Sequence, residues 1–341
     1  MKIKSFYLLS LSCDNLLQAC VVKQSLLLLI IMSNNYFQKC IDKIRGKKKI
    51  NVANPKLAFG EKFIYSQVDS QDLISSYLLS GKPVLMSRFG TVELETVRQY
   101  LKHQKRKEVF DPFQKEYMES TPGFFPVDDY NMTKFACEQI EVTKKVDIMS
   151  VRREKFEEEM CLRYLPENSK LVDINSLSSP MNYSRPWSKH LAGKKVLVIH
   201  PFENSIRKQY AKRDLLFKNP EVLPEFELLT YKPVQGIADS KKDLPFETWF
   251  DALDYMKNDI SKIDYDVAII GAGAYGMFLG AFCKDMGKQA LHLGGATQML
   301  FGIKGKRWDG STLYNEHWVR PSADETPKGV ERFEHGTFAY W

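Results

Sequence analysis

The stretch DYDVAIIGAGAYG, residues 264–276, decides the fold class because it joins a short apolar run to a glycine-rich turn. Residues 267–270 are all apolar, which is typical of a strand buried on both faces of a parallel sheet. The segment that follows, MFLGAFCKDMGK (277–288), has the apolar spacing of a helix. A strand that runs through glycines into a helix is the repeating unit of α/β proteins.

The glycine spacing Gly271-x-Gly273-x-x-Gly276 is that of a dinucleotide-binding turn. Such a turn lets backbone N–H groups and the positive end of a helix face an anion without a Cβ in the way. A dinucleotide site also requires an acidic residue about 20 positions later, at the end of the next strand. The segment QALHLGG (289–295) carries no carboxylate there. We therefore expect another phosphorylated ligand and no NAD; a purely structural turn is the alternative.

Along the chain, short apolar runs alternate with segments of helical spacing. The expected strands are 83–89, 146–151, 170–177, 194–202, 226–234, 266–272 and 289–295. The expected helices are 91–104, 132–144, 154–165, 204–217, 246–260 and 276–287. This order predicts an α/β, Rossmann-like fold with a mainly parallel sheet and helices on both faces.

The composition is that of an ordinary globular protein, since 44% hydrophobic and 27% charged residues exclude a disordered or collagenous chain. We expect residues 51–341 to form one α/β domain whose tail, from about residue 302, wraps the sheet edge. Residues 1–50 are expected to be an extension that is partly apolar and then basic. Within it, residues 1–31 are interpreted as a mis-called start or a dispensable extension; a signal sequence or a segment resting on a membrane is the alternative.

The formal net charge of +7 gathers mainly in two runs, Lys43–Lys49 and Lys102–Lys107. We interpret them as solvated faces; contact with an anionic membrane surface or a phosphorylated acceptor is the alternative. We expect no nucleic-acid partner. The six cysteines form no C-x-x-C pair, which favours a reducing compartment. The expected location is the cytoplasm, including the inner face of the membrane.

In open α/β sheets, ligands collect beyond the carboxyl ends of the strands. Here that rule selects residues 88–93, 152–153, 200–203, 271–276 and 294–298.

The first of these segments, SRFGTVELETV (87–97), is the most informative. It places Arg88 at a strand end, Gly90 in the turn, Thr91 as a helix cap and Glu93 in the first helical turn. Arg88 would hold a phosphate, and Glu93 would reach a metal ion, a sugar hydroxyl or a proton. The alternative is that Glu93 only stabilises the helix dipole.

Two histidines stand at the ends of buried strands. His200 in VLVIHPFE (196–203) is expected to act as a base or to contact the substrate, and His292 in ALHLGG (290–295) has a similar position. For each, a hydrogen bond to a backbone carbonyl is the alternative. Lys306 and Arg307 lie in the segment GIKGKRWD (302–309), which we expect to close over the phosphates as a basic loop.

Three stretches together resemble the GT-D-fold glycosyltransferases of bacterial surface-polysaccharide and glycoprotein assembly: residues 84–97, 200–239 and 266–309. The likeness spans residues 60–320, and the later two stretches are its more specific part. It implies one Rossmann-like domain, a nucleotide-sugar donor and a glycan, lipid-linked or protein acceptor.

That family carries Asp-x-Glu where this chain has Thr91-Val92-Glu93. Glu93 carries over directly, whereas Thr91 replaces the aspartate, and a neutral hydroxyl is a weak ligand for Mg²⁺ or Mn²⁺. A bound divalent cation would therefore draw most of its negative charge from Glu93 and the diphosphate.

We predict a nucleotide-sugar-dependent glycosyltransferase with Glu93 and His200 as catalytic candidates and Glu93 as the candidate metal ligand. The substrate-binding candidates are Arg88, Gly90, Thr91, Gly271, Gly273, Gly276, His292, Lys306 and Arg307. A dinucleotide-dependent oxidoreductase and a non-catalytic module that binds a nucleotide or a glycan are the alternatives.

Overall fold

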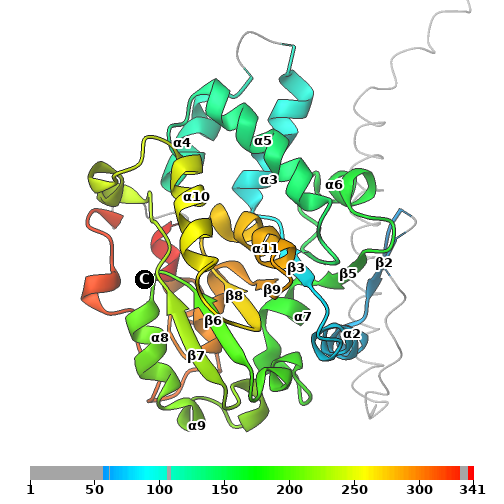
Figure 1. Cartoon of the computed structure of the whole chain (residues 1–341), viewed down its shortest axis with the longest axis vertical. Helices are drawn as coiled ribbons and strands as arrows, with labels where there is room; N and C mark the ends of the chain where they lie inside the picture. Colours follow the sequence, from blue (N-terminus) through cyan, green and yellow to red (C-terminus); the bar gives the residue numbers. More distant parts are fainter. Residues whose placement is uncertain (1–56, 61, 106–108, 331–336) are drawn as a thin grey trace, which may run out of the picture. The chain divides into compact units, whose positions relative to one another are not determined.

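The computed structural model describes residues 57–60, 62–105, 109–330 and 337–341 (Figure 1). In these residues one sheet has the strand order β1-β2-β5-β4-β3-β9-β8-β6-β7. The strands are β1 (Leu57–Phe59), β2 (Lys62–Tyr65), β3 (Val84–Arg88), β4 (Ile148–Val151), β5 (Lys170–Asp173), β6 (Lys195–Ile199), β7 (Glu227–Tyr231), β8 (Val267–Ile270) and β9 (Gln289–His292). All neighbouring pairs from β2 to β7 are parallel, and β1 is antiparallel to β2. The predicted α/β, mainly parallel fold is confirmed.

Helices cover both faces of the sheet. They are α2 (Gln67–Leu79), α3 (Thr91–His103), α4 (Pro112–Ser120), α5 (Asp129–Thr143), α6 (Glu157–Tyr164), α7 (Ile174–Ser178), α8 (Glu203–Tyr210), α9 (Arg213–Leu216), α10 (Trp249–Ile260), α11 (Tyr275–Asp285) and α12 (Thr297–Leu300). Along β8, Ala268 and Ile270 join the core beneath α3, α5, α10 and α11, whereas Val267 and Ile269 join the core beneath α2, α7 and α8. The alternation explains why the whole strand is apolar.

Two predicted elements differ from the structure. The strand expected over 170–177 ends at Asp173, because the Asp173 side chain accepts a hydrogen bond from the Asn175 amide and caps α7. The helix expected over 204–217 is divided into α8 and α9. The predictions for residues 1–50, including the basic run Lys43–Lys49, lie outside the described residues.

The tail after residue 302 returns over the side of the sheet that carries α8. Ile303 forms a β-bridge with Val319, and Trp318 is buried beside Phe217. The Glu325 carboxylate accepts hydrogen bonds from the amides of Asn204 (2.8 Å) and Ser205 (3.1 Å), two residues of the first turn of α8. A buried carboxylate at a helix N-terminus satisfies the orphan amides and interacts favourably with the dipole. The tail is therefore anchored to the body of the fold.

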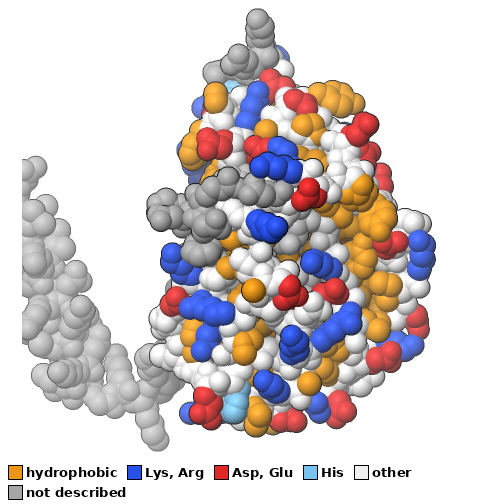
Figure 2. Space-filling view, turned by 90° about the vertical axis from the view of Figure 1, so that its left-hand side faces the viewer, with side chains coloured by type: hydrophobic (Ala, Val, Ile, Leu, Met, Phe, Trp, Pro, Cys, Tyr) orange, Lys and Arg blue, Asp and Glu red, His pale blue; other side chains and the backbone are white. Residues whose placement is uncertain are grey.

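The surface gives two further observations. Among the helices of the described residues, none combines the length and the apolar composition that spanning a bilayer requires. On the face shown in Figure 2, Lys and Arg side chains are spread among Asp and Glu rather than gathered into one patch.

Candidate active site

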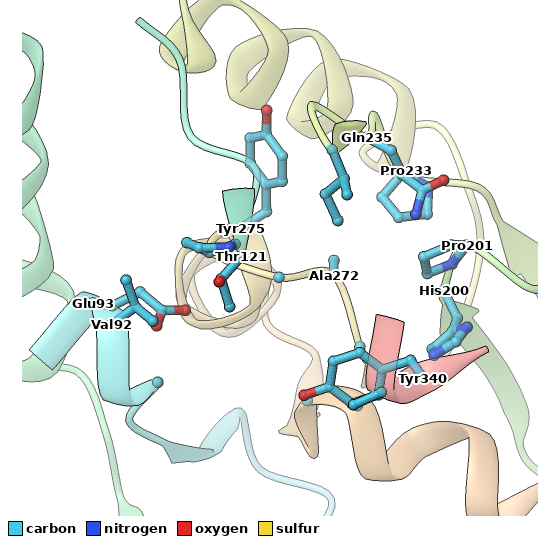
Figure 3. A pocket seen from close by; sticks show the side chains of 18 of the residues that line it. Val92, Glu93, Thr121, His200, Pro201, Pro233, Gln235, Ala272, Tyr275 and Tyr340 are labelled. Carbon is cyan, nitrogen blue, oxygen red and sulfur yellow. The ribbon is translucent and has the colours of Figure 1, made fainter. Parts of the chain in front are cut away.

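A cavity of about 280 Å³ opens beyond the carboxyl ends of the neighbouring strands β3, β9, β8 and β6 (Figure 3). Most of the predicted site residues line it: Arg88, Gly90, Thr91, Glu93, His200, Gly271, Gly273, His292 and Arg307. Figure 3 shows Glu93 and Val92 on one side and His200 with Pro201 on the other, with Ala272 of the glycine turn between them. The topology thus brings segments from four parts of the sequence to one edge of the sheet, as the strand-end rule predicts.

The Glu93 carboxylate is placed by the start of α3. The N-cap of this helix is Gly90, with no side-chain cap, so Thr91 is the first helical residue and not the cap that the sequence suggested. A Cβ on Gly90 would lie 1.8 Å from Glu93 Oε2, so the glycine makes room for the carboxylate over the helix start. Glu93 forms no hydrogen bond or ion pair with another described residue. Its charge remains available to a ligand.

Three arginines face the same cavity. Arg88 is half-buried at the end of β3, and its guanidinium makes no hydrogen bond or ion pair within the described part of the chain. Burial and the nearby guanidinium of Arg152 lower the pKa of Arg88, and Glu93 opposes that shift. Arg307 donates from Nη1 to the Tyr340 hydroxyl at 3.1 Å. Positive charge converging on one cavity is the arrangement of an anion site.

Arg152 is the third member and is partly satisfied. Its Nη2 donates to the Phe89 carbonyl and to Thr91 Oγ1, each at 3.3 Å. Its Nε is buried and makes no hydrogen bond with a described residue, although Glu154 Oε1 lies 3.8 Å away as an ion-pair partner. A buried N–H without an acceptor is costly, so an incoming anion would complete its hydrogen bonding.

The glycine turn adds backbone donors. The Gly271 amide donates to the Ile199 carbonyl at 2.9 Å, which fixes the turn to β6. The amides of Ala272 and Gly273 donate to no described residue, and both residues line the cavity just before α11. Consecutive unpaired amides at a helix start form a concavity that suits a phosphate.

We expect Gly273→Ala to destabilise the protein by more than the usual cost of placing an alanine in the left-handed backbone conformation. Gly273 has φ +53°, and a Cβ there would lie 2.8 Å from the Pro122 carbonyl oxygen. The backbone conformation alone costs about 1–2 kcal/mol, and the contact adds to it. Urea denaturation measures the loss, with Gly81→Ala as the matched control, because Gly81 has φ +65° and open space around it. Equal losses in the two variants would show that the Pro122 contact is relaxed at no cost.

Both strand-end histidines are buried and neutral. Burial lowers the pKa of His200 to about 3, and its Nδ1 accepts from the Phe202 amide at 3.1 Å, which assigns the proton to Nε2. Burial and the charge of Arg88 lower the pKa of His292 to about 3, and its Nδ1 lies 2.9 Å from Ser87 Oγ. A histidine in this state holds a proton weakly, so the surroundings of His200 favour a substrate contact over a base at neutral pH.

Two predicted ligand contacts, Gly276 and Lys306, do not line the cavity. Gly276 lies in α11, where a Cβ would be 2.2 Å from His292 Nε2. The third glycine of the motif therefore lets α11 pack on β9, and its expected contact with the substrate is corrected to a packing role. Lys306 is exposed at the start of a short 3₁₀ helix.

Other lining residues were not among the site predictions: Tyr117, Thr121, Gln235, Tyr275, Gln298, Tyr340 and Trp341. Gln298 lies in a segment that the strand-end rule had selected, and Gln235 follows the end of β7. The strand-end rule could therefore have predicted both residues. The C-terminal aromatic residues carry no such signal, because they belong to no regular element of the sheet.

The donor set for a metal ion is small. No group of three or more His, Cys, Asp and Glu side chains that could hold a metal occurs in the described ranges. Glu93 is the one carboxylate among the described residues around the cavity. The Thr91 hydroxyl accepts from Arg152 and lies 3.5 Å from Glu154 Oε1. A divalent cation at Glu93 would need further oxygen ligands from the substrate or from water.

Comparisons with known proteins give a distant structural likeness. No family model and no curated protein sequence matches the chain. Two solved structures resemble it, each covering 76% of this chain and 96% of the other. One is described as the highly conserved domain of unknown function 1792 with a distinct glycosyltransferase fold (13% identity, TM-score 0.41), the other as a selenomethionine-substituted structure of domain of unknown function 1792 (12%, 0.40).

Proposed function

We propose that the chain is a glycosyltransferase that takes a sugar from a nucleotide-sugar donor, of the GT-D type that its motifs resemble. The observation that carries the proposal is the half-buried Arg88 guanidinium, which has no described partner and faces a cavity shared with the unpaired amides of Ala272 and Gly273. Together these groups offer a diphosphate one positive charge and two backbone N–H hydrogen-bond donors. Stabilising the departing diphosphate is the main electrostatic demand of glycosyl transfer.

The nucleoside fits the side of the cavity opposite Glu93. Its wall is largely apolar and is made by Pro201, Phe202, Pro233, Val234 and Trp341. Figure 3 shows Pro201 and Pro233 together on the His200 side. The proton on His200 Nε2 makes this histidine a donor to an oxygen of the base or the ribose.

The transferred sugar then lies toward Glu93. The acceptor hydroxyl attacks the anomeric carbon as the bond from that carbon to the diphosphate oxygen breaks, and the electron pair leaves with the diphosphate. In an inverting reaction one base takes the acceptor proton, and Glu93 is the group with the chemistry for that step. If a divalent cation accompanies the diphosphate, Glu93 is its protein ligand. The acceptor, a glycan, a lipid-linked saccharide or a protein, and a site of action at the cytoplasmic face of a membrane are part of the proposal.

A thermal-shift panel tests the ligand class. We expect a nucleoside diphosphate or a nucleotide sugar to raise the melting temperature, because a ligand at 100 times its Kd stabilises the native state by about 2.7 kcal/mol. NAD(H), measured alongside with and without Mn²⁺, is expected to give no shift, since no carboxylate follows β9 to hold its ribose. NADP(H) is included in the same panel. A shift with NAD(H) and none with any nucleoside diphosphate would overturn the proposal in favour of an oxidoreductase.

A further inference from the structure

Tyr340 packs at the edge of the cavity. A Cβ on Gly295 would lie 2.0 Å from Tyr340 Cε1, so the ring rests against the turn that follows β9. The Tyr340 carbonyl accepts from Gln298 Nε2 at 3.1 Å, and the Trp308 ring centroid lies 5.9 Å from that of Tyr340. Figure 3 shows the ring extending into the cavity between the Glu93 and His200 sides. Packing and hydrogen bonding thus fix where its hydroxyl lies.

The hydroxyl has one hydrogen left to donate. Arg307 Nη1 lies 3.1 Å from the Tyr340 oxygen, and a guanidinium can only donate, so the phenol oxygen is the acceptor of this bond. No described residue accepts from the phenol O–H. The phenol is also near enough to Arg88 to influence its pKa, which it raises. Among the described residues, the Tyr340 O–H is therefore a free hydrogen-bond donor close to Arg88 and Arg307. Its acceptor would have to come from a bound ligand.

We propose that Tyr340 binds the ligand directly, donating its O–H to a phosphate oxygen that Arg88 and Arg307 also hold. The inference rests on the proposed function, and it adds a contact from a segment outside the sequence motifs. Phosphate oxygens only accept hydrogen bonds, which matches three donors aimed at one place. The competing reading is that Tyr340 acts through Arg307 alone by holding its guanidinium.

Tyr340→Phe separates a ligand contact from a packing role, because it keeps the ring on Gly295 and removes only the hydroxyl. We expect titration calorimetry to show about tenfold weaker binding of pyrophosphate and of UDP or GDP, the size of one hydrogen bond to a charged group. The melting temperature of the ligand-free protein is expected to stay unchanged. Any binding of the uncharged nucleoside uridine should be unaffected, since it has no phosphate.

A double-mutant cycle with Arg307→Gln decides between the direct contact and the competing reading. If Tyr340 contacts the phosphate, Tyr340→Phe weakens binding by a similar factor in the wild-type and Arg307→Gln backgrounds. If it only positions Arg307, its effect disappears once Arg307 is gone, and the inference is overturned.

Gly295→Ala gives a second route to the same answer. The new Cβ must displace the Tyr340 ring, so we expect a loss of diphosphate affinity at least as large as in Tyr340→Phe. Wild-type affinity in either variant would overturn this inference and leave the proposed function standing. Failure of the wild-type protein to bind any of the diphosphates would overturn both.

Discussion

Glu93→Gln is expected to lower turnover by about a hundredfold or more, equivalent to about 2.7 kcal/mol of activation free energy. The substitution preserves the size of the side chain and its place over Gly90, and it removes the one carboxylate that the described residues bring to the cavity. A base or a metal ligand cannot act without that charge. The rate of sugar transfer or hydrolysis is measured with whichever nucleotide sugar stabilises the protein.

Glu95→Gln is the matched control for this experiment. Glu95 lies on the same helix and pairs with Arg98 outside the cavity, so its loss should leave turnover unchanged. If Glu93 were only a favourable charge in the first turn of α3, Glu93→Gln would cost about 0.3–1 kcal/mol of stability and little activity. Full activity with that small loss would place the chemistry elsewhere, and His200 would be changed next.

Arg88→Met is expected to weaken diphosphate binding by about a hundredfold while leaving the ligand-free protein as stable as before or more stable. The guanidinium is half-buried, has no described partner and lies near two other cations. Its desolvation therefore lowers the stability of the folded state, and no ion pair with a described residue offsets that cost. Charge-assisted hydrogen bonds to a ligand are worth about 1.5–3 kcal/mol each. Calorimetry with pyrophosphate and urea denaturation without ligand measure the two effects.

Arg98→Met is the control for Arg88→Met. Arg98 is ion-paired with Glu95 on α3 and does not line the cavity. We expect a small loss of stability there and no change in affinity. The reverse pattern at Arg88, lower stability with unchanged affinity, would mean that its guanidinium serves the fold and not a ligand.

The sequence predicted the parts of the cavity lining that follow buried strands. Arg88, His200 and the residues of the glycine turn each come directly after an apolar run, and parallel pairing brings the ends of those runs together whatever their distance in the chain. The strands β1 and β2 were missed because they are short. In β2 only Ile64 is buried, so no apolar run or clear alternation marks it. Helix α2 contains serines and a mixed polar face, and its periodicity is weak for the same reason.

The remaining site residues were beyond local sequence signals. Tyr340 lies in the tail, where nothing periodic relates it to β9, and its position depends on close contact with Gly295. Gly276 shows the opposite error: the motif spacing suggested a ligand, whereas the contact that requires glycine is with His292. A glycine pattern indicates that something approaches the backbone closely, and only tertiary structure shows what it is.

The Glu325 anchor couples two equilibria. Opening of the Glu325 anchor would expose the amides of Asn204 and Ser205 and would remove the 3.0 Å hydrogen bond from Trp341 Nε1 to the Glu325 carbonyl, next to Tyr340, so it is a local unfolding reaction with its own free energy. A ligand that contacts Tyr340 binds only the form with the tail closed. Opening of the tail therefore weakens the apparent affinity for the ligand, and by thermodynamic linkage ligand binding suppresses tail opening by the same factor. Amide hydrogen exchange in the tail would therefore slow as ligand is added. If the proposed Tyr340 contact holds, the affinity for the diphosphate would depend in part on how firmly Glu325 caps α8.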